Sequence, residues 1–172
     1  MKKKKVNKTV MAAMLLGVGL VLPFMTMQIK ELGDSLLPMH LPVMLCGLVC
    51  GPVYGTGVGV ILPVLRSLLF SMPPLYPASV WMALEMGTYG LVLGLMYRGT
   101  KKEKLWYLYV CLLTAMLSGR IVWGIAKSVL LGLGDKPFTM EMFVAGGFVD
   151  AVPGIILQLV LIPGIMTILK KK

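Results

Sequence analysis

The chain contains 172 residues, of which 58% are hydrophobic and 14% are charged, and its mean hydropathy is +0.87. Soluble domains have a charged fraction of about a quarter, so this chain has too little polar surface for a water-exposed globule and is predicted to be a membrane protein. Its net charge of +10 does not indicate nucleic-acid binding, because the lysines cluster at the ends of apolar runs and form no basic stripe along a soluble face.

The first of six predicted helical spans is Thr9–Ile29. A helix needs about 20 apolar residues to cross a hydrocarbon core of ~30 Å, and this stretch has that length. Lys2–Lys5 precede it as they would precede a secretory signal, but no small-residue cleavage pattern follows Pro23. We therefore interpret it as an uncleaved span.

The second and third spans come from one apolar region, Leu36–Ser71, which is too long for a single straight helix. Gly51 and Pro52 lie in its middle, where glycine permits a turn and proline interrupts helical hydrogen bonding. A short helix over Pro38–Cys50 and a longer one over Tyr54–Phe70 are therefore predicted. The proline-rich link Ser71–Pro77 cannot be regular helix. The remaining spans are predicted at Ser79–Tyr97, Leu105–Leu131 and Thr139–Leu169.

Basic residues gather at three places, namely the N-terminus, the loop Arg98–Lys104 and the C-terminal Lys170–Lys172. Lysine and arginine concentrate in cytoplasmic loops, and these three places lie on one side of the membrane only if the number of crossings is even. The sequence therefore predicts an all-α membrane protein, a single domain over residues 1–172, folded as a six-transmembrane-helix bundle with both termini cytoplasmic.

Small residues recur at four-residue intervals, a spacing that lets helix backbones approach closely in lipid. The positions are Gly47, Gly51, Gly55 and Gly59, then Gly90 and Gly94, then Ala13 and Gly17. Contact inside the bundle is the favoured interpretation of this spacing. Contact with a separate membrane partner is the alternative, and it suits Ala13 and Gly17 on the first span best.

Several polar residues lie inside the apolar spans, although a charged side chain costs about 2.5–3.5 kcal/mol at the centre of an inserted helix. They are the charged residues Arg66, Glu85, Arg120, Lys127 and Asp150, with the neutral residues His40 and Gln158. On the predicted topology most of them lie toward the outer halves of their spans. This asymmetry predicts a polar cavity that opens outward and is closed by apolar packing below.

The intramembrane charges comprise three cations against two carboxylates, and the surplus favours an anionic ligand, most simply a carboxylate. Arg120 is the preferred binding group, because guanidinium can bind a carboxylate through two parallel hydrogen bonds. Internal ion pairing that only holds the helices in register is the alternative. Lys127 would then reach outward from its helix end, and Trp123 would either line the cavity or anchor the helix at the interface.

No enzymatic constellation is present in the sequence, so no catalytic residue is predicted. The chain has one histidine, and its three cysteines, Cys46, Cys50 and Cys111, lie within apolar runs as packing residues do. No metal site is predicted, because further soft or imidazole ligands are missing from the surrounding sequence. No phosphate-binding loop is present either, so energy for uphill transport would have to come from a partner or an ion gradient.

The segment Leu37–Gly55 carries the pattern Pro-x-x-x-x-Gly-x-x-x-Gly-Pro-x-x-Gly, and it is followed by Arg66, Met72-Pro73-Pro74 and Glu85–Gly90. These residues resemble the second to fourth helices of substrate-binding S components of energy-coupling-factor (ECF) vitamin transporters. Length, helix number and basic ends extend the resemblance over the whole chain, although the remainder matches in architecture alone.

The resemblance implies a multi-pass protein of the bacterial plasma membrane that binds a vitamin near its outer face and binds no cofactor itself. It also implies docking on a transmembrane scaffold, the T component, driven by two cytoplasmic ATPases that use ATP. Ala13 and Gly17 correspond to the family's docking patch, although Gly17 departs from the usual alanine.

Within this family, Met39–Pro42 and Met72–Pro74 most resemble members assigned to pantothenate, with nicotinate, pyridoxine and riboflavin as alternatives. The residues predicted to bind the substrate are His40, Arg66, Glu85, Arg120, Trp123, Lys127 and Asp150. Two other classes remain open at this point. One is a small membrane enzyme that acts on a lipid-linked substrate with Glu85 or Asp150 as base, and the other is an accessory bundle whose charges only pair internally.

Overall fold

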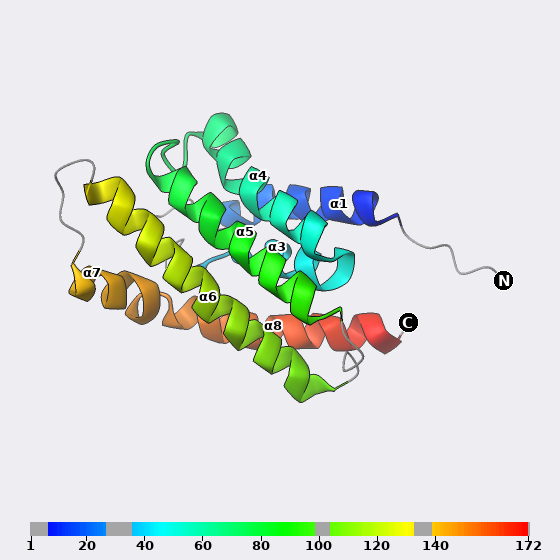
Figure 1. Cartoon of the computed structure of the whole chain (residues 1–172). Coiled ribbons are helices and arrows are strands. Elements are labelled where there is room, and N and C mark those ends of the chain that lie inside the picture. Colours follow the sequence, from blue (N-terminus) through cyan, green and yellow to red (C-terminus); the bar gives the residue numbers. More distant parts are fainter. Residues whose placement is uncertain (1–6, 27–35, 99–103, 133–138, 172) are drawn as a thin grey trace.

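The computed structural model describes residues 7–26, 36–98, 104–132 and 139–171, and within these ranges every regular element is helical. The elements in chain order are α1 (Lys8–Val21), the 3-10 helix η1 (Leu22–Thr26), α3 (His40–Cys50), α4 (Pro52–Phe70), α5 (Ala78–Met96), α6 (Leu105–Gly132), α7 (Met140–Val144), the π-helix η2 (Ala145–Val149) and α8 (Val152–Lys171). Figure 1 shows their arrangement. The all-helical fold class is confirmed for the described part of the chain.

Four of the predicted spans are long and apolar enough to cross a membrane, namely Pro52–Phe70, Ala78–Met96, Leu105–Gly132 and Met140–Leu169. The apolar helices Lys8–Phe24 and His40–Cys50 are shorter than a span requires. At 1.5 Å per residue, the 11 residues of α3 extend over only about half of a ~30 Å hydrocarbon core. Six full crossings therefore remain a prediction.

The first predicted span, Thr9–Ile29, changes its helical type before it ends. The α-helix stops at Val21 and continues as a 3-10 helix to Thr26. Pro23 explains the change, because it has no N–H to donate to the preceding turn of an α-helix. The last three residues of that span lie outside the described ranges.

The predicted turn between the second and third spans is present at Gly51. This residue has φ 100°, a conformation that only glycine adopts without steric cost. Pro52 then starts α4 at its first position, where its missing N–H has no partner to lose. The pair thus reverses the chain within two residues. Residues 71–77 connect α4 to α5 without regular helix, as predicted.

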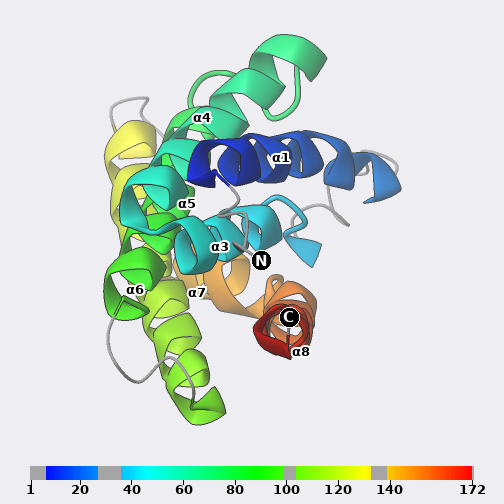
Figure 2. The same cartoon turned by 90° about the vertical axis from the view of Figure 1, so that its right-hand side faces the viewer.

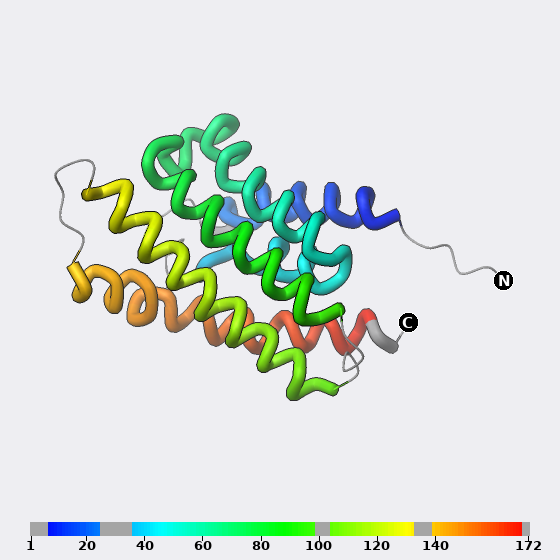
Figure 3. The backbone as a smooth tube through the Cα atoms, viewed as in Figure 1, coloured from blue at the N-terminus to red at the C-terminus, as the bar shows by residue number. Residues whose placement is uncertain are grey.

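The sixth predicted span, Thr139–Leu169, is interrupted. It comprises α7, the π-turn η2 and α8, with Asp150 and Ala151 as a turn between the last two. In the tube of Figure 3, the regular helical winding is interrupted between α7 and α8. Gly146 and Gly147 lie in the π-turn, and glycine is the residue whose presence weakens a regular helix most after proline.

The beginning of α1 and the end of α8 lie at the same end of the bundle, on the right of Figure 1. The end of α5 and the beginning of α6 lie there as well. The exposed Arg98 is at this end, since its guanidinium is 3.8 Å from the place where a Cβ of Gly51 would be. The helix ends that adjoin the three basic places therefore lie at one end of the bundle, whereas most of the basic residues lie outside the described ranges and the side of the membrane is not shown.

Helix α3 lies at the centre of the bundle, with α1 and α4 on one side and α8 on the other (Figure 2). Glycines bring α3, α4 and α5 into backbone contact. A Cβ on Gly55 would lie 2.6 Å from Cα of Gly47 and 2.8 Å from the carbonyl oxygen of Gly90. A Cβ on Gly94 would lie 2.3 Å from the nitrogen of Pro52. Internal packing is thus confirmed as the reason for this glycine spacing.

Candidate functional site

Polar and aromatic residues form one row on α5 and another on α6. Trp81, Glu85 and Tyr89 follow one another at four-residue intervals on α5, which places them on one helix face. Arg120, Trp123 and Lys127 are spaced by three and four residues on α6 and share a face in the same way. Helices α5 and α6 pack against each other, and these two rows meet between them.

Glu85 is the centre of the cluster. Its Oε1 lies 3.0 Å from Nη1 of Arg120, accepts a hydrogen bond of 2.8 Å from the Tyr89 hydroxyl, and is 3.6 Å from Nε2 of His40. His40 is the first residue of α3. Side chains from three helices, α3, α5 and α6, therefore meet at the Glu85 carboxylate. The rings of His40 and Tyr89 are in edge contact, with centroids 5.3 Å apart.

The members of this cluster are sealed inside the bundle. His40, Glu85 and Tyr89 are each 2% exposed, and Arg120 is 4% exposed. Both ring nitrogens of His40 and Nη2 of Arg120 are buried without a hydrogen-bond partner in the described structure. Buried polar groups are nearly always paired, so unpaired donors on a charged residue in the middle of a membrane bundle indicate a place for a ligand.

Aromatic rings cover the cationic groups of α6. The guanidinium carbon of Arg120 is 5.8 Å from the ring centroid of Trp123, and Nζ of Lys127 is 4.6 Å from the same ring. Lys127 also faces Trp81, at 5.6 Å. Cation–π contacts at these distances are attractive. They hold both cations against the Trp123 ring, and Arg120 also contacts Glu85.

The π-turn of the sixth span packs against this site. A Cβ on Gly146 would lie 3.3 Å from Trp123, and one on Gly147 would lie 3.5 Å from it. Phe143 of α7 also contacts the indole, with centroids 6.2 Å apart. Turns of π-helix occur frequently at functional sites, and here the two glycines of the turn leave room for the Trp123 ring.

Helix α8 reaches the site through Gln158, which is 2% exposed. Its Nε2 donates a 3.5 Å hydrogen bond to the carbonyl of Leu37. That carbonyl also accepts from the backbone N–H of His40. Gln158 therefore fixes the start of α3 and, with it, the position of the His40 ring.

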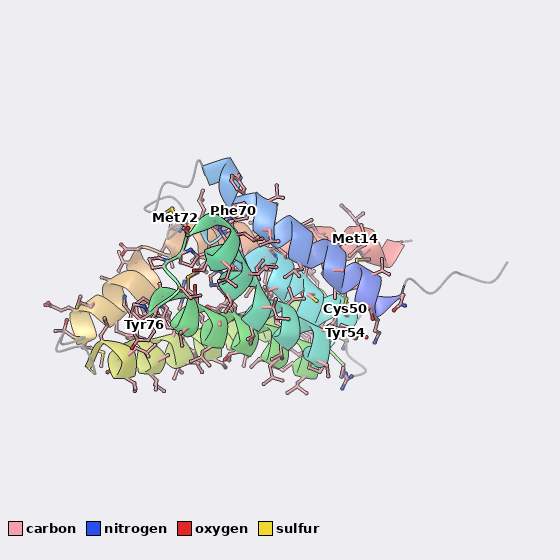
Figure 4. The ribbon with its side chains drawn as sticks, turned by 90° about the horizontal axis from the view of Figure 1, so that it is seen from above. Met14, Cys50, Tyr54, Phe70, Met72 and Tyr76 are labelled. Carbon is pink, nitrogen blue, oxygen red and sulfur yellow. The ribbon has the colours of Figure 1, made fainter. Side chains whose placement is uncertain are left out.

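The structure places Arg66 outside this cluster. Its guanidinium lies between the rings of Phe24 and Phe70, at 5.3 and 5.4 Å, and Nη1 donates a 2.8 Å hydrogen bond to the Leu20 carbonyl. Arg66 thus ties α1 to α4, near the end of α4 where Figure 4 labels Phe70.

Asp150 also lies apart from the cluster. It is exposed in the turn after η2, and no ion pair joins it to a cation among the described residues. The three cations and two carboxylates that the sequence analysis counted together therefore do not form one site, because Arg66 and Asp150 lie outside it. Glu85 pairs with Arg120, so the alternative of internal pairing holds for that pair. Ligand binding by Arg66 and Asp150 stays a prediction that their contacts do not support.

Tyr89 and Trp81 join the site although the sequence did not single them out for it. Both are four residues from Glu85 on the same helix, and that spacing was the available signal. Gly119 also belongs here, because a Cβ on it would lie 2.4 Å from the Tyr89 ring. Glycine next to Arg120 thus makes room for the ring whose hydroxyl contacts Glu85.

Two other surfaces lie outside this cluster. An open groove of about 400 Å³ between α6 and α7 has mostly apolar walls that include Ile121, Ile125 and Phe143. On α1, Ala13 and Gly17 are exposed, and nothing lies within 4 Å of a Cβ built on Gly17. Their docking role stays a prediction. Within the described residues, no three His, Cys, Asp or Glu side chains form a group that could hold a metal ion.

Comparison with known proteins supports one family. A family model described as "ECF transporter, substrate-specific component" matches residues 7–169. The comparisons with curated proteins and with solved structures gave no match. Because the family model covers nearly the whole chain, including every residue of the Glu85 cluster, this protein belongs to the family of substrate-specific components of ECF transporters.

Proposed function

We propose that this chain captures a small water-soluble vitamin that carries a carboxylate, with pantothenate as the leading candidate. The observation that carries the proposal is Nη2 of Arg120, which is buried and has no hydrogen-bond partner among the described residues. Arginine is the residue best suited to bind carboxylate in a desolvated site. An anionic group of the ligand would supply the missing acceptor, and His40 would supply a further polar contact.

Family membership supports a proposal about assembly with other subunits. We propose that the chain docks on a T component in a bacterial plasma membrane and that two partner ATPases hydrolyse ATP to drive uptake. Ala13 and Gly17 are the docking positions, because they are small, exposed and in register on one face of α1. In this proposal the chain binds its ligand stoichiometrically and performs no chemical conversion.

The proposal is tested by isothermal titration of the detergent-solubilised protein with pantothenate, nicotinate, pyridoxine and riboflavin. Tight one-to-one binding of pantothenate with weak binding of the two vitamins that lack a carboxylate is expected. Preference for nicotinate would keep the carboxylate and correct the vitamin. Preference for pyridoxine or riboflavin would contradict the assignment of Arg120 to an anionic ligand group.

A further inference from the structure

Two cations of α6 flank one indole ring along the helix. Arg120 lies one turn before Trp123, and Lys127 lies one turn after it. The guanidinium carbon of Arg120 is 5.8 Å from the ring centroid, and Nζ of Lys127 is 4.6 Å from it. The Trp123 ring therefore lies between the two positive charges.

The two cations differ in how deeply they are buried. Arg120 and its partner Glu85 are 4% and 2% exposed, and Trp123 is 7% exposed. Lys127 is half-buried, and so is Trp81, whose ring centroid is 5.6 Å from Nζ. Trp81 lies one turn before Glu85 on α5, toward the same end of the bundle as Lys127. The seam between α5 and α6 thus passes from a half-buried cation through an aromatic ring to a sealed cation.

A half-buried positive charge in this place meets an anion before the sealed one does. Cation–π contacts are weaker than charge-assisted hydrogen bonds, so a carboxylate can replace the rings as the partner of Nζ. We infer that Lys127 is the residue that the arriving carboxylate contacts first, and that the carboxylate then passes the Trp123 ring to Arg120. This inference rests on the proposed function, because it takes Arg120 as the final binding group.

The chemistry of the two side chains suits these two steps. Lysine is a compact charge on a flexible stem, whereas the planar guanidinium can hold a carboxylate with two hydrogen bonds. Nη2 of Arg120 is buried and has no hydrogen-bond partner among the described residues. A charge at the rim of a site acts mainly on the association rate and its salt dependence, and a fully buried one acts on the dissociation rate. Lys127 and Arg120 are therefore expected to have separable kinetic effects.

Stopped-flow tryptophan fluorescence of the intact detergent-solubilised protein measures both rate constants for pantothenate. Lys127→Gln is expected to lower the association rate constant about three- to tenfold at low salt, because one attractive charge is lost. The decrease of this rate constant with ionic strength is expected to become shallower than in the wild-type protein. The dissociation rate constant is expected to change by less than about twofold.

Two further variants control for charge and for folding. Lys127→Arg keeps the charge and is expected to keep the wild-type association rate. Lys104→Gln removes an exposed lysine next to the opposite end of α6 and is expected to have no effect on either rate. An unchanged association rate in Lys127→Gln, or an equal decrease in Lys104→Gln, would overturn the inference. Faster dissociation alone would also overturn it, because Lys127 would then belong to the final binding site.

Iodide quenching tests the attraction of anions without the vitamin. Trp106→Phe removes an indole that is 55% exposed, so the two tryptophans that remain, Trp81 and Trp123, are those in contact with Lys127. In this background Lys127→Gln is expected to reduce quenching by iodide about twofold or more and to leave quenching by neutral acrylamide unchanged.

The two measurements distinguish failure of the inference from failure of the proposed function. Equal iodide quenching with and without Lys127 would overturn the inference, and tight binding of pantothenate in the same preparation would leave the proposed function in place. A clear effect of Lys127 on iodide quenching, with no binding of a vitamin carboxylate by the wild-type protein, would overturn the proposed function and keep the attraction of anions by Lys127.

Discussion

At the scale of single residues, the site depends on how a few charged groups are paired inside an apolar bundle. Glu85 has a cation and a hydroxyl donor on one oxygen, so its burial is compensated. Nη1 of Arg120 is paired with Glu85, whereas Nη2 is buried without a hydrogen-bond partner among the described residues. Leaving a charged donor unpaired in such a place costs free energy, and ligand binding recovers that free energy. The unpaired donor therefore contributes to affinity.

Tyr89→Phe tests the orienting role of the hydroxyl. The ring keeps its packing on Gly119, but Oε1 of Glu85 loses a donor, and a hydrogen bond to a charged group contributes about 1.5–3 kcal/mol. Pantothenate binding is expected to weaken about tenfold or more, since 1.4 kcal/mol corresponds to a factor of ten. Titration of Tyr109→Phe, at a partly exposed position on α6, provides the control, and equal affinities of the two variants would refute the role.

Residue types and spacing predicted part of this site. Arg120, Trp123 and Lys127 could be chosen because they are polar or aromatic within one apolar span. Their partner Glu85 could be chosen for the same reason. Arg66 could not be separated from them, because the acceptor of its guanidinium is the Leu20 carbonyl, a backbone group on another helix. Such long-range backbone requirements are not visible in a local sequence pattern.

At the scale of helices, glycine decides how closely α3, α4 and α5 approach. Without side chains at Gly47, Gly55 and Gly90, the three backbones are in contact, and dispersion attraction between backbones replaces the hydrophobic effect, which is weak between helices in lipid. This close packing places the first residue of α3, His40, beside Glu85 on α5.

Gly55→Ala is expected to destabilise the bundle, because its Cβ would lie 2.6 Å from Cα of Gly47 and the backbone cannot yield as a side chain can. Overpacking of this kind costs about 1–3 kcal/mol. Gly57→Ala on the same helix is the matched control, because nothing lies within 4 Å of its Cβ. Thermal unfolding in detergent should show a lower Tm for the first variant alone, and equal Tm values would contradict the packing account.

Gly17→Leu tests the docking role of α1. The position is exposed and its surroundings are open, so the leucine leaves the fold of the chain intact. It would separate two helix backbones that approach through small residues. We expect unchanged vitamin binding by the isolated chain and loss of co-purification with the T component. Gly57→Leu serves as the control, and retained assembly of Gly17→Leu would rule out this face as the docking surface.

Helix positions could be predicted from the lengths of the apolar runs and from the glycines and prolines that end them. The predicted third, fourth and fifth spans differ from the observed helices by two residues or fewer at each end. The interruption of the sixth span was not predicted. Gly146 and Gly147 alone are compatible with a helix, and their π-turn is fitted to the ring of Trp123 on another helix.

At the scale of the whole molecule, the polar cluster and the basic helix ends are separated along the bundle. Glu85 lies in the first half of α5 and Arg120 in the second half of α6, away from the end of the bundle where α1 begins and α8 ends (Figure 1). Positive charge marks the cytoplasmic side. The arrangement thus agrees with capture of a ligand from outside.

Cysteine labelling in intact cells tests this orientation. Leu75→Cys lies between α4 and α5 and Arg98→Cys lies at the opposite end, and both positions are exposed. The native cysteines are buried and would be replaced by alanine to remove background. A membrane-impermeant maleimide is expected to label Leu75→Cys and not Arg98→Cys. The reverse pattern would mean that the site faces the cytoplasm.

The central claim is that Arg120 binds the carboxylate of the ligand, and titration of pantothenate into Arg120→Lys tests it most directly. Lysine keeps the charge beside Glu85 but lacks the planar second donor. Binding is expected to weaken at least about tenfold, whereas Arg66→Lys, the matched change at the other buried arginine, keeps the affinity of its folded fraction. Wild-type affinity in Arg120→Lys, or an equal loss in both variants, would contradict the claim.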